Sequence, residues 1–154
     1  MSVCVKQRRV AGFTLIELMV TLVVAAILIS IAVPAYQTQV RKSRRTEARN
    51  AVMDLAAREE RYYSVNNAYT NVALELGYGQ DNAVISGRPI GSGYYTVSVD
   101  LTAPEPAATP PVRAGFKITA IAAGTQLKDA PCQKFVVDEV GTQTSTPSAA
   151  ECWN

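Results

Sequence analysis

Residues 11–36, AGFTLIELMVTLVVAAILISIAVPAY, decide how this chain is organised. Residues 18–33 contain no charge, and only Thr21 and Ser30 among them are polar. As a helix rising about 1.5 Å per residue, residues 13–36 would be roughly 36 Å long, enough to cross a hydrocarbon core of about 30 Å. A carboxylate, Glu17, lies near the start of this run. We therefore expect a membrane-spanning helix that carries one costly charge.

Charge is concentrated at the N-terminal end of the 154-residue chain. The net charge of +2 is too small to indicate a nucleic-acid partner by itself. Lys6, Arg8 and Arg9 precede the apolar run without an acid among them, and removing these three from the fifteen basic residues leaves twelve against thirteen acidic ones. A basic stub before an apolar run is typical of an export or anchoring signal.

The residue content also limits the chemistry. Histidine is absent, which excludes His-based triads, His general bases and His metal ligands. The sequence has no evident metal-ligand cluster, phosphate-binding loop or catalytic carboxylate pair, and it predicts no enzyme, no cofactor and no metal site.

The three cysteines are divided between the two ends of the chain: Cys4 lies in the basic stub, whereas Cys132 and Cys152 lie near the C-terminus. Loss of the stub would leave one pair, which suits an oxidising compartment; three unrelated thiols are the alternative.

Three interpretations of the N-terminal signal compete. The run could be removed after Ala35 to release a soluble protein, it could be an ordinary single-span anchor, or cleavage after Gly12 could leave the apolar run at the new N-terminus. Glu17 favours the third, because a carboxylate inside a spanning helix costs roughly 2.5–3.5 kcal/mol and usually has a partner. Cleavage would expose an α-amine on Phe13, and this cation could pair with Glu17 of a neighbouring subunit in a low dielectric.

A single helix is expected to continue beyond the span. Residues 37–63 contain neither glycine nor proline and are rich in helix formers, which predicts one helix from about residue 14 to about residue 63. Pro34 should kink or loosen it, and a simple break at residues 30–33 is the alternative. Asp54 and Arg58 are spaced for an ion pair. One apolar stripe should pack on a head domain; it consists of Val40, Ala48, Ala51, Val52, Leu55 and Tyr62.

The rest of the chain predicts a small antiparallel sheet. Residues 64–93 lack periodicity and are rich in glycine, which indicates a long connecting loop. Alternating apolar residues predict strands at 94–101, 114–122 and 133–140. Short links between them favour a meander over residues 94–140 that covers the helix, so the expected class is α+β. The predicted organisation is a 13–36 span followed by a 37–154 head.

The stretch AGFTLIELMV resembles the processing motif of type IV prepilins: a basic leader, Gly, Phe, an apolar run, and Glu as the fifth residue after the cut. This resemblance implies that a prepilin peptidase removes leader residues 1–12 after Gly12 and that Phe13 is N-methylated. It also implies that the helices pack into a filament core through Glu17. A leader of this length and a terminal Phe resemble the type IVa class. The type IV pilin fold further implies a C-terminal region, 132–152, bounded by a Cys132–Cys152 disulfide.

Further segments resemble the PilE-type minor pilins of twitching pili: RRTEA (44–48), AAREERYYSVNNAYT (56–70) and the terminal ECWN. The resemblance implies a minor pilin that acts in pilus assembly, twitching motility or cell adhesion. It would span the inner membrane once, with a periplasmic head, and then enter the extracellular pilus. The implied partners are other pilins, the peptidase, the platform protein, the assembly ATPase and the secretin. The alternatives are a major or DNA-uptake pilin, a type II secretion pseudopilin, or a secreted protein cut after Ala35.

Basic residues after the span oppose the positive-inside rule for an exported head: Arg41, Lys42, Arg44, Arg45 and Arg49. We interpret this cluster as a solvated or inter-subunit face that complements acidic residues of a neighbour (Asp54, Glu59 and Glu60) rather than as a nucleic-acid contact. The cations of the head are too scattered to predict a DNA groove; they are Arg88, Arg113, Lys117, Lys128 and Lys134. Tyr62, Tyr63 and Tyr69 are expected to pack between helix and head, and Trp153 to cover the disulfide.

Overall fold

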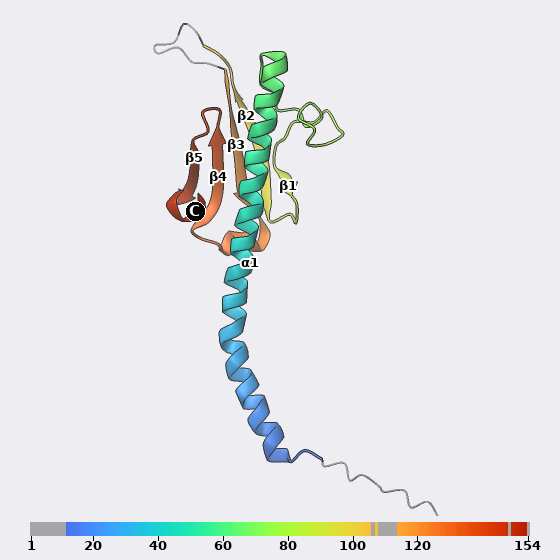
Figure 1. Cartoon of the computed structure of the whole chain (residues 1–154), viewed down its shortest axis with the longest axis vertical. Coiled ribbons are helices and arrows are strands. Elements are labelled where there is room, and N and C mark those ends of the chain that lie inside the picture. Colours follow the sequence, from blue (N-terminus) through green and yellow to red (C-terminus); the bar gives the residue numbers. More distant parts are fainter. Residues whose placement is uncertain (1–11, 106, 108–113, 148, 154) are drawn as a thin grey trace, which may run out of the picture. The chain divides into compact units, whose positions relative to one another are not determined.

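The structure is a computed structural model that describes residues 12–105, 107, 114–147 and 149–153. The chain divides into two compact units, Met1–Gln39 and Val40–Asn154. Helix α1, Leu15–Asn66, has 52 residues and contributes to both units (Figure 1). Its second part, from Val40 onward, belongs to the head.

Both ends of α1 have a local cause. Thr14 immediately precedes the helix, and its hydroxyl accepts a hydrogen bond from the backbone N–H of Glu17 at 3.3 Å, which satisfies one of the free donors of the first turn. At the other end, Asn67 has a left-handed backbone with φ of 52°, and its N–H donates to the Tyr63 carbonyl at 2.8 Å. Asparagine tolerates this conformation better than most residues and therefore ends the helix. The predicted helix, 14–63, agrees within three residues.

The head contains one antiparallel sheet whose five strands lie side by side in chain order, β1-β2-β3-β4-β5. The β2–β3 pair is the longest, with Val97 opposite Ala120 and Val99 opposite Ile118. A 3-10 turn, η1 (Gly124–Lys128), joins β3 to β4, and a short helix, α2 (Ala149–Trp153), follows β5. The strands are β1 (Arg88–Ile90), β2 (Tyr95–Thr102), β3 (Gly115–Ala122), β4 (Cys132–Asp138) and β5 (Gln143–Pro147).

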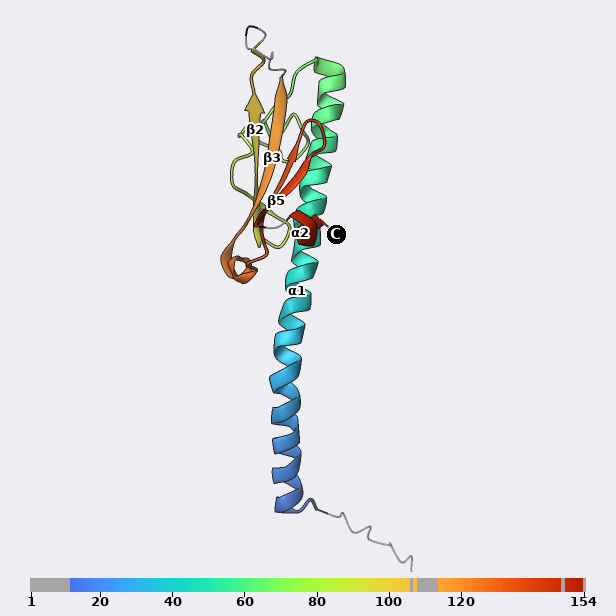
Figure 2. The ribbon, with the colours of Figure 1, turned by 90° about the vertical axis from the view of Figure 1, so that its left-hand side faces the viewer.

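The core lies between one face of the sheet and the head part of α1, as both views of the ribbon show (Figures 1 and 2). Ala48, Val52 and Leu55 of α1 are fully buried, and Phe135 and Ile118 of the sheet are buried in the same cluster. Of the predicted stripe, Ala51 and Tyr62 are partly buried against this core and Val40 is half-exposed. The α+β prediction is therefore confirmed.

The prediction of three strands over residues 94–140 is wrong in the number of strands. The sheet has five, because the short strands β1 and β5 flank the three predicted ones. Strand β1 lies inside the region 64–93 that was predicted as a loop, and a β-bridge joins Val72 to Val84 in the same region. β1 has three residues, one of them Pro89, and exists because β2 provides its hydrogen-bond partners. No local periodicity signals a strand of that length. The loop also contributes buried side chains to the core, namely Ala73, Leu76 and Ile85.

Strand β5 is the other element that the sequence did not predict. Its sequence, QTSTP, lacks an apolar alternation, and most of its side chains are exposed. It forms because β4 pairs with it, with Phe135 opposite Ser145 and Val137 opposite Gln143. The C-terminal region predicted to be bounded by the disulfide therefore also contains a strand and most of a short helix.

Candidate functional site

The N-terminal helical unit exposes an unusually apolar surface. Every described side chain from residue 12 to residue 39 is exposed, including Phe13 at 80% and Leu15 at 77%. Within the described residues one helix, α1, is long and apolar enough to cross a membrane. The hydroxyls of Thr21 and Ser30 donate back to the carbonyls of Leu18 and Ile27, at 2.9 and 2.7 Å, which satisfies them without water. An apolar surface of this size indicates a site covered by lipid or by other helices.

Glu17 lies in the first turn of this helix. Thr14 and Glu17 have the spacing of a capping box, in which Ser or Thr before the helix is followed three residues later by Glu. The positive end of the helix dipole favours a carboxylate at this position. The fold thus keeps Glu17 within one turn of Phe13, as the assembly hypothesis requires, and its pairing with a neighbour stays a prediction.

Pro34 lies inside α1, and residues 30–33 are helical, so the alternative of a simple break there is wrong. Proline cannot donate to the carbonyl four residues earlier. The Thr38 hydroxyl donates to the Pro34 carbonyl at 3.0 Å, one turn further along. The predicted kink remains an expectation.

The RRTEA segment fastens α1 to its own head. The Arg44 guanidinium lies 3.3 Å from the ring centroid of Tyr94. The Glu47 carboxylate accepts hydrogen bonds from the backbone N–H and the hydroxyl of Ser92, at 2.9 and 2.7 Å. Ala48 is fully buried. Neighbouring residues of one helical turn thus hold α1 against the turn that joins β1 to β2.

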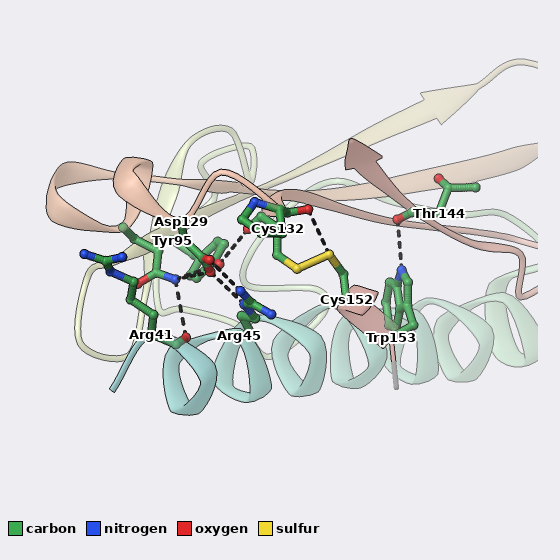
Figure 3. Close-up of a disulfide and its surroundings, with 10 residues drawn as sticks. Arg41, Arg45, Tyr95, Asp129, Cys132, Thr144, Cys152 and Trp153 are labelled. Carbon is green, nitrogen blue, oxygen red and sulfur yellow. Dashed lines mark hydrogen bonds and ion pairs between the residues drawn. A yellow bond between two sulfur atoms is a disulfide. The ribbon is translucent and has the colours of Figure 1, made fainter. Parts of the chain in front are cut away.

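Arg45 makes the most buried ion pair of the described residues. Its guanidinium donates two hydrogen bonds to Asp129, at 2.7 and 2.5 Å, and the side chain of Asp129 is only 3% exposed. These hydrogen bonds raise the pKa of Arg45. Gln126, also buried, donates to Asp129 at 2.9 Å and to the Tyr95 hydroxyl at 3.2 Å, and Tyr95 donates to the Cys132 carbonyl at 2.9 Å (Figure 3). A polar network therefore links helix, η1 and disulfide.

These contacts correct our interpretation of the basic cluster at 41–49. Arg44 and Arg45 bind residues of their own head instead of forming a free inter-subunit face. Two of the acidic residues proposed to complement the cluster are also engaged: Glu59 is fully buried, and Asp54 pairs with Arg58 at 2.7 Å. The predicted Asp54–Arg58 pair is confirmed.

The predicted disulfide is present between Cys132 and Cys152, whose Cα atoms are 5.6 Å apart. That Trp153 covers this bond stays a prediction; its contacts join it to β4 and β5. Its indole N–H donates to the Thr144 carbonyl at 3.0 Å (Figure 3). Its ring also packs nearly perpendicular to that of Phe135, with centroids 5.5 Å apart. The disulfide and the indole together hold α2 against β4 and β5.

Replacing Cys152 by serine is expected to speed proteolysis within residues 139–154. A disulfide closing a separation of 20 residues contributes about 3 kcal/mol, whereas the single Trp153 hydrogen bond contributes about 1 kcal/mol. Limited proteolysis followed by mass spectrometry measures the change. Cys4→Ser, which removes a thiol upstream of the described residues, is the control. Equal digestion of the Cys152 variant and the control would contradict a stabilising role for the bond.

Glu59 is the charged residue that sequence reasoning misplaced. It follows Leu55 by four residues and Val52 by seven, so it belongs to the buried stripe, and this spacing was the available signal. One carboxylate oxygen accepts from the Thr70 N–H at 3.1 Å, and the other has no hydrogen-bond partner among the described residues. Burial is the largest cause that raises the pKa of Glu59, to about 7; Glu60 and Glu75 add to it, and the Thr70 bond opposes it.

The pKa of Glu59 predicts that the head loses stability as pH rises. Both states are protonated below about 4.5, so this contribution is fully present there, and it is lost as pH rises through about 7, where an ionised carboxylate must stay buried. A shift of this size corresponds to about 3 kcal/mol between pH 4 and pH 8. Denaturant unfolding at several pH values should show this slope in the wild type and not in Glu59→Gln. Glu60→Gln, which removes a smaller contribution to the same pKa shift, should keep most of the slope because Glu59 stays buried. An unchanged slope in Glu59→Gln contradicts the assignment.

The aromatic residues pack as predicted between the helix end and the sheet. The rings of Tyr63 and Tyr69 stack with centroids 4.6 Å apart, and Tyr69 meets Phe116 edge-on at 5.0 Å.

Of the head cations considered for a DNA groove, Arg88 pairs with Asp81. Arg113 lies outside the described residues. Among the described residues no group of three His, Cys, Asp or Glu side chains could hold a metal ion.

Two family models match consecutive parts of the chain. The model of the prokaryotic N-terminal methylation motif matches residues 7–33, and that described as "Type IV minor pilin ComP, DNA uptake sequence receptor" matches residues 34–136. The architecture is a long helix whose second part packs on a five-stranded antiparallel sheet, and the second match covers more than half of the chain. The chain therefore belongs to this family of type IV minor pilins, and the pilin prediction is confirmed.

Individual relatives carry pilin names as well. The chain is 33% identical over 97 residues to fimbrial protein EcpC of Eikenella corrodens, covering 59% of this chain and 63% of that protein. It is 31% identical over 70 residues to the type IV major pilin protein PilA of Myxococcus xanthus, covering 46% and 32%. Each match thus spans less than two thirds of the relative. The structure of a type IV pilin from Shewanella oneidensis is 25% identical, with a TM-score of 0.46, and the match covers 71% of this chain and 96% of that one.

Proposed function

We propose that this chain is a structural subunit of a type IV pilus, assembled through its N-terminal helix and without chemistry of its own. One observation carries the proposal: the methylation-motif match at 7–33 coincides with the N-terminal part of α1, where every described side chain up to residue 39 is exposed. A surface of this kind needs lipid before assembly and neighbouring helices afterwards. The family to which the chain belongs is one of structural pilins, not of enzymes.

In this proposal a prepilin peptidase cuts after Gly12 and Phe13 becomes the N-methylated terminus. Phe13 lies outside α1, and Thr14 caps the helix directly after it. The new α-amine is therefore within about one turn of Glu17, and it can pair with Glu17 of an adjacent subunit.

Mass spectrometry of the mature N-terminus tests the processing step. The expected terminus is methylated Phe13. A terminus at Tyr36 would support a secreted protein cut after Ala35, and an intact Met1 would support an ordinary anchor; either result contradicts the proposal.

Before assembly, the span is proposed to anchor the chain in the inner membrane with its head in the periplasm. The Cys132–Cys152 disulfide supports an oxidising compartment. The basic residues after the span argued for the opposite orientation, but Arg44 and Arg45 are bound within the head. Their charge thus has a role in folding. The proposed partners are other pilins, the peptidase, the platform protein and the ATPase.

Within the pilus we propose a minor-pilin role, in priming assembly or linking a tip complex, as the family description supports. A major pilin and a type II secretion pseudopilin remain alternatives. Quantifying this chain against the main subunit in sheared fibres distinguishes them, because a minor pilin should be a small fraction and a major pilin the bulk.

DNA binding is a second candidate function, because the matched family is described as a DNA uptake sequence receptor. Lys134 of β4 lies opposite Ile121 of β3, and cross-strand partners share a face of the sheet. Lys117 is four residues before Ile121 and therefore has the same outward face. Both lysines are exposed. They are the described cations that could contact phosphates from this face.

Replacing both Lys117 and Lys134 by glutamine should weaken duplex binding and reduce the slope of log affinity against log salt by about 0.9 per lost phosphate contact. Fluorescence anisotropy over a salt series measures both quantities. Arg61→Gln, at an exposed residue of α1, is the control. Unchanged binding by the double variant contradicts this surface, and equal affinity for specific and scrambled duplexes contradicts a receptor for one sequence.

A further inference from the structure

The basic residues that directly follow the span do not all bind the head. Lys42 is exposed, and its side chain makes no hydrogen bond or ion pair among the described residues. It follows Tyr36 by six residues, which is about 9 Å along a helix, and α1 is continuous between them. Headgroup layers extend about 5–8 Å beyond the hydrocarbon core on each side. The chain itself therefore keeps Lys42 close to the headgroups when the span is inserted.

The η1 turn lies at the same level of α1. Gln126 is fully buried and donates to the Arg41 carbonyl at 3.4 Å, and Asp129 at the end of η1 pairs with Arg45. These contacts fix the turn, which is the orange loop between β3 and β4 in Figures 1 and 2. The next two residues point outward: Leu127 is 54% exposed and Lys128 is exposed. An apolar side chain and a cation thus occupy the end of the head where α1 enters.

We infer that Lys42, Leu127 and Lys128, here called the basal patch, contact the anionic headgroups of the membrane in which the pilin waits before assembly. Lysine stems extend along apolar surface while their ammonium groups reach phosphate, and Leu127 can enter the boundary between headgroups and acyl chains. A membrane surrounds the span on all sides, so the three residues need not lie on one side of α1. The inference rests on the anchored state proposed above.

The contact gives a role in an exported protein to Lys42, the exposed cation that follows the span. A basic residue near an anionic surface is attracted over about one Debye length, roughly 8 Å at physiological salt. Leaving the membrane for the filament would break this contact. The basal patch therefore holds the head at the surface before extraction.

Hydrogen exchange of the full chain in lipid nanodiscs tests the inference. Backbone amides of residues 123–129 should exchange about tenfold more slowly in discs that contain phosphatidylglycerol than in phosphatidylcholine discs, because two cations meet the anionic surface. High salt should remove the difference. Equal exchange in the two lipids would overturn the inference. Co-elution with the discs reports anchoring separately, so a chain that never enters the disc overturns the anchored state as well.

The double variant Lys42→Gln/Lys128→Gln should lose the lipid dependence while its unfolding stays like that of the wild type, since both side chains are exposed and neither makes a hydrogen bond or an ion pair among the described residues. Lys117→Gln, which removes an exposed cation from β3, should keep it. Retention of the dependence by the double variant would overturn the assignment to these residues. Slower exchange on adding duplex DNA to phosphatidylcholine discs, without an effect of phosphatidylglycerol, would show that nucleic acid rather than lipid occupies the patch and would also overturn it.

Discussion

Replacing Glu17 by valine is expected to leave membrane insertion intact and to lower incorporation into fibres at least about tenfold. In the proposed filament the carboxylate pairs with the α-amine of Phe13 in an adjacent subunit. Two unit charges about 4 Å apart attract by about 4 kcal/mol at an effective dielectric of 20. Valine removes this attraction, and it also removes the cost of about 2.5–3.5 kcal/mol for a charge in a spanning helix. Immunoblots of sheared fibres and of membranes measure the two pools.

Two variants separate charge pairing from helix stability. Thr21→Val changes a polar residue of the same segment without changing its size, and Thr14→Ala removes the helix cap while keeping Glu17. Both should enter fibres. Normal incorporation of the Glu17 variant would exclude the pairing mechanism, and equal failure of Thr14→Ala would assign the effect to the helix start.

Replacing Arg45 by methionine is expected to lower the free energy of unfolding of the head by about 3–5 kcal/mol, because it leaves Asp129 charged and buried without its partner. Among the described residues, the Asp129 carboxylate would keep one hydrogen bond, from Gln126. Denaturant unfolding of the detergent-solubilised chain, followed by circular dichroism, measures the loss.

The exposed pair Asp54–Arg58 provides the control. Its carboxylate side chain is 50% exposed, and exposed pairs contribute up to about 1 kcal/mol, so Asp54→Asn should have a small effect. Adding Asp129→Asn to the Arg45 variant should recover part of the stability, since the uncompensated charge is gone. If Arg45→Met costs no more than Asp54→Asn, the polar network is not what holds the helix to η1.

The RRTEA segment thus serves the fold before it serves any partner. Arg44 covers Tyr94, Arg45 pairs with Asp129, and Glu47 holds Ser92. These contacts reach two connections of the sheet, β1–β2 and β3–β4, from one turn of helix. Arg44 and Arg45, which were expected to form an inter-subunit face, bind within the subunit instead. Of the basic cluster, Lys42 is the side chain that stays exposed.

Much of the fold could be predicted because local patterns extend over many residues. The apolar run and the uninterrupted helix formers up to Tyr63 predict α1, and the alternation in β2 and β3 predicts the centre of the sheet. The cysteine count and the resemblance to pilins predicted the Cys132–Cys152 pair. Strands β1 and β5 could not be predicted, since three and five residues without alternation become strands only beside β2 and β4.

The sequence by itself determined the processing motif, the exposed helix and the residues of the α1 stripe, because each is a property of neighbours along one chain. Only the tertiary structure decided which charges are free. Glu59 sits in the buried stripe with its pKa raised, and Arg45 is tied to Asp129, 84 residues away. The physical reason is that burial and charge pairing depend on which residues the other elements place next to a side chain. A pattern along the sequence does not show which distant residues become neighbours in the fold.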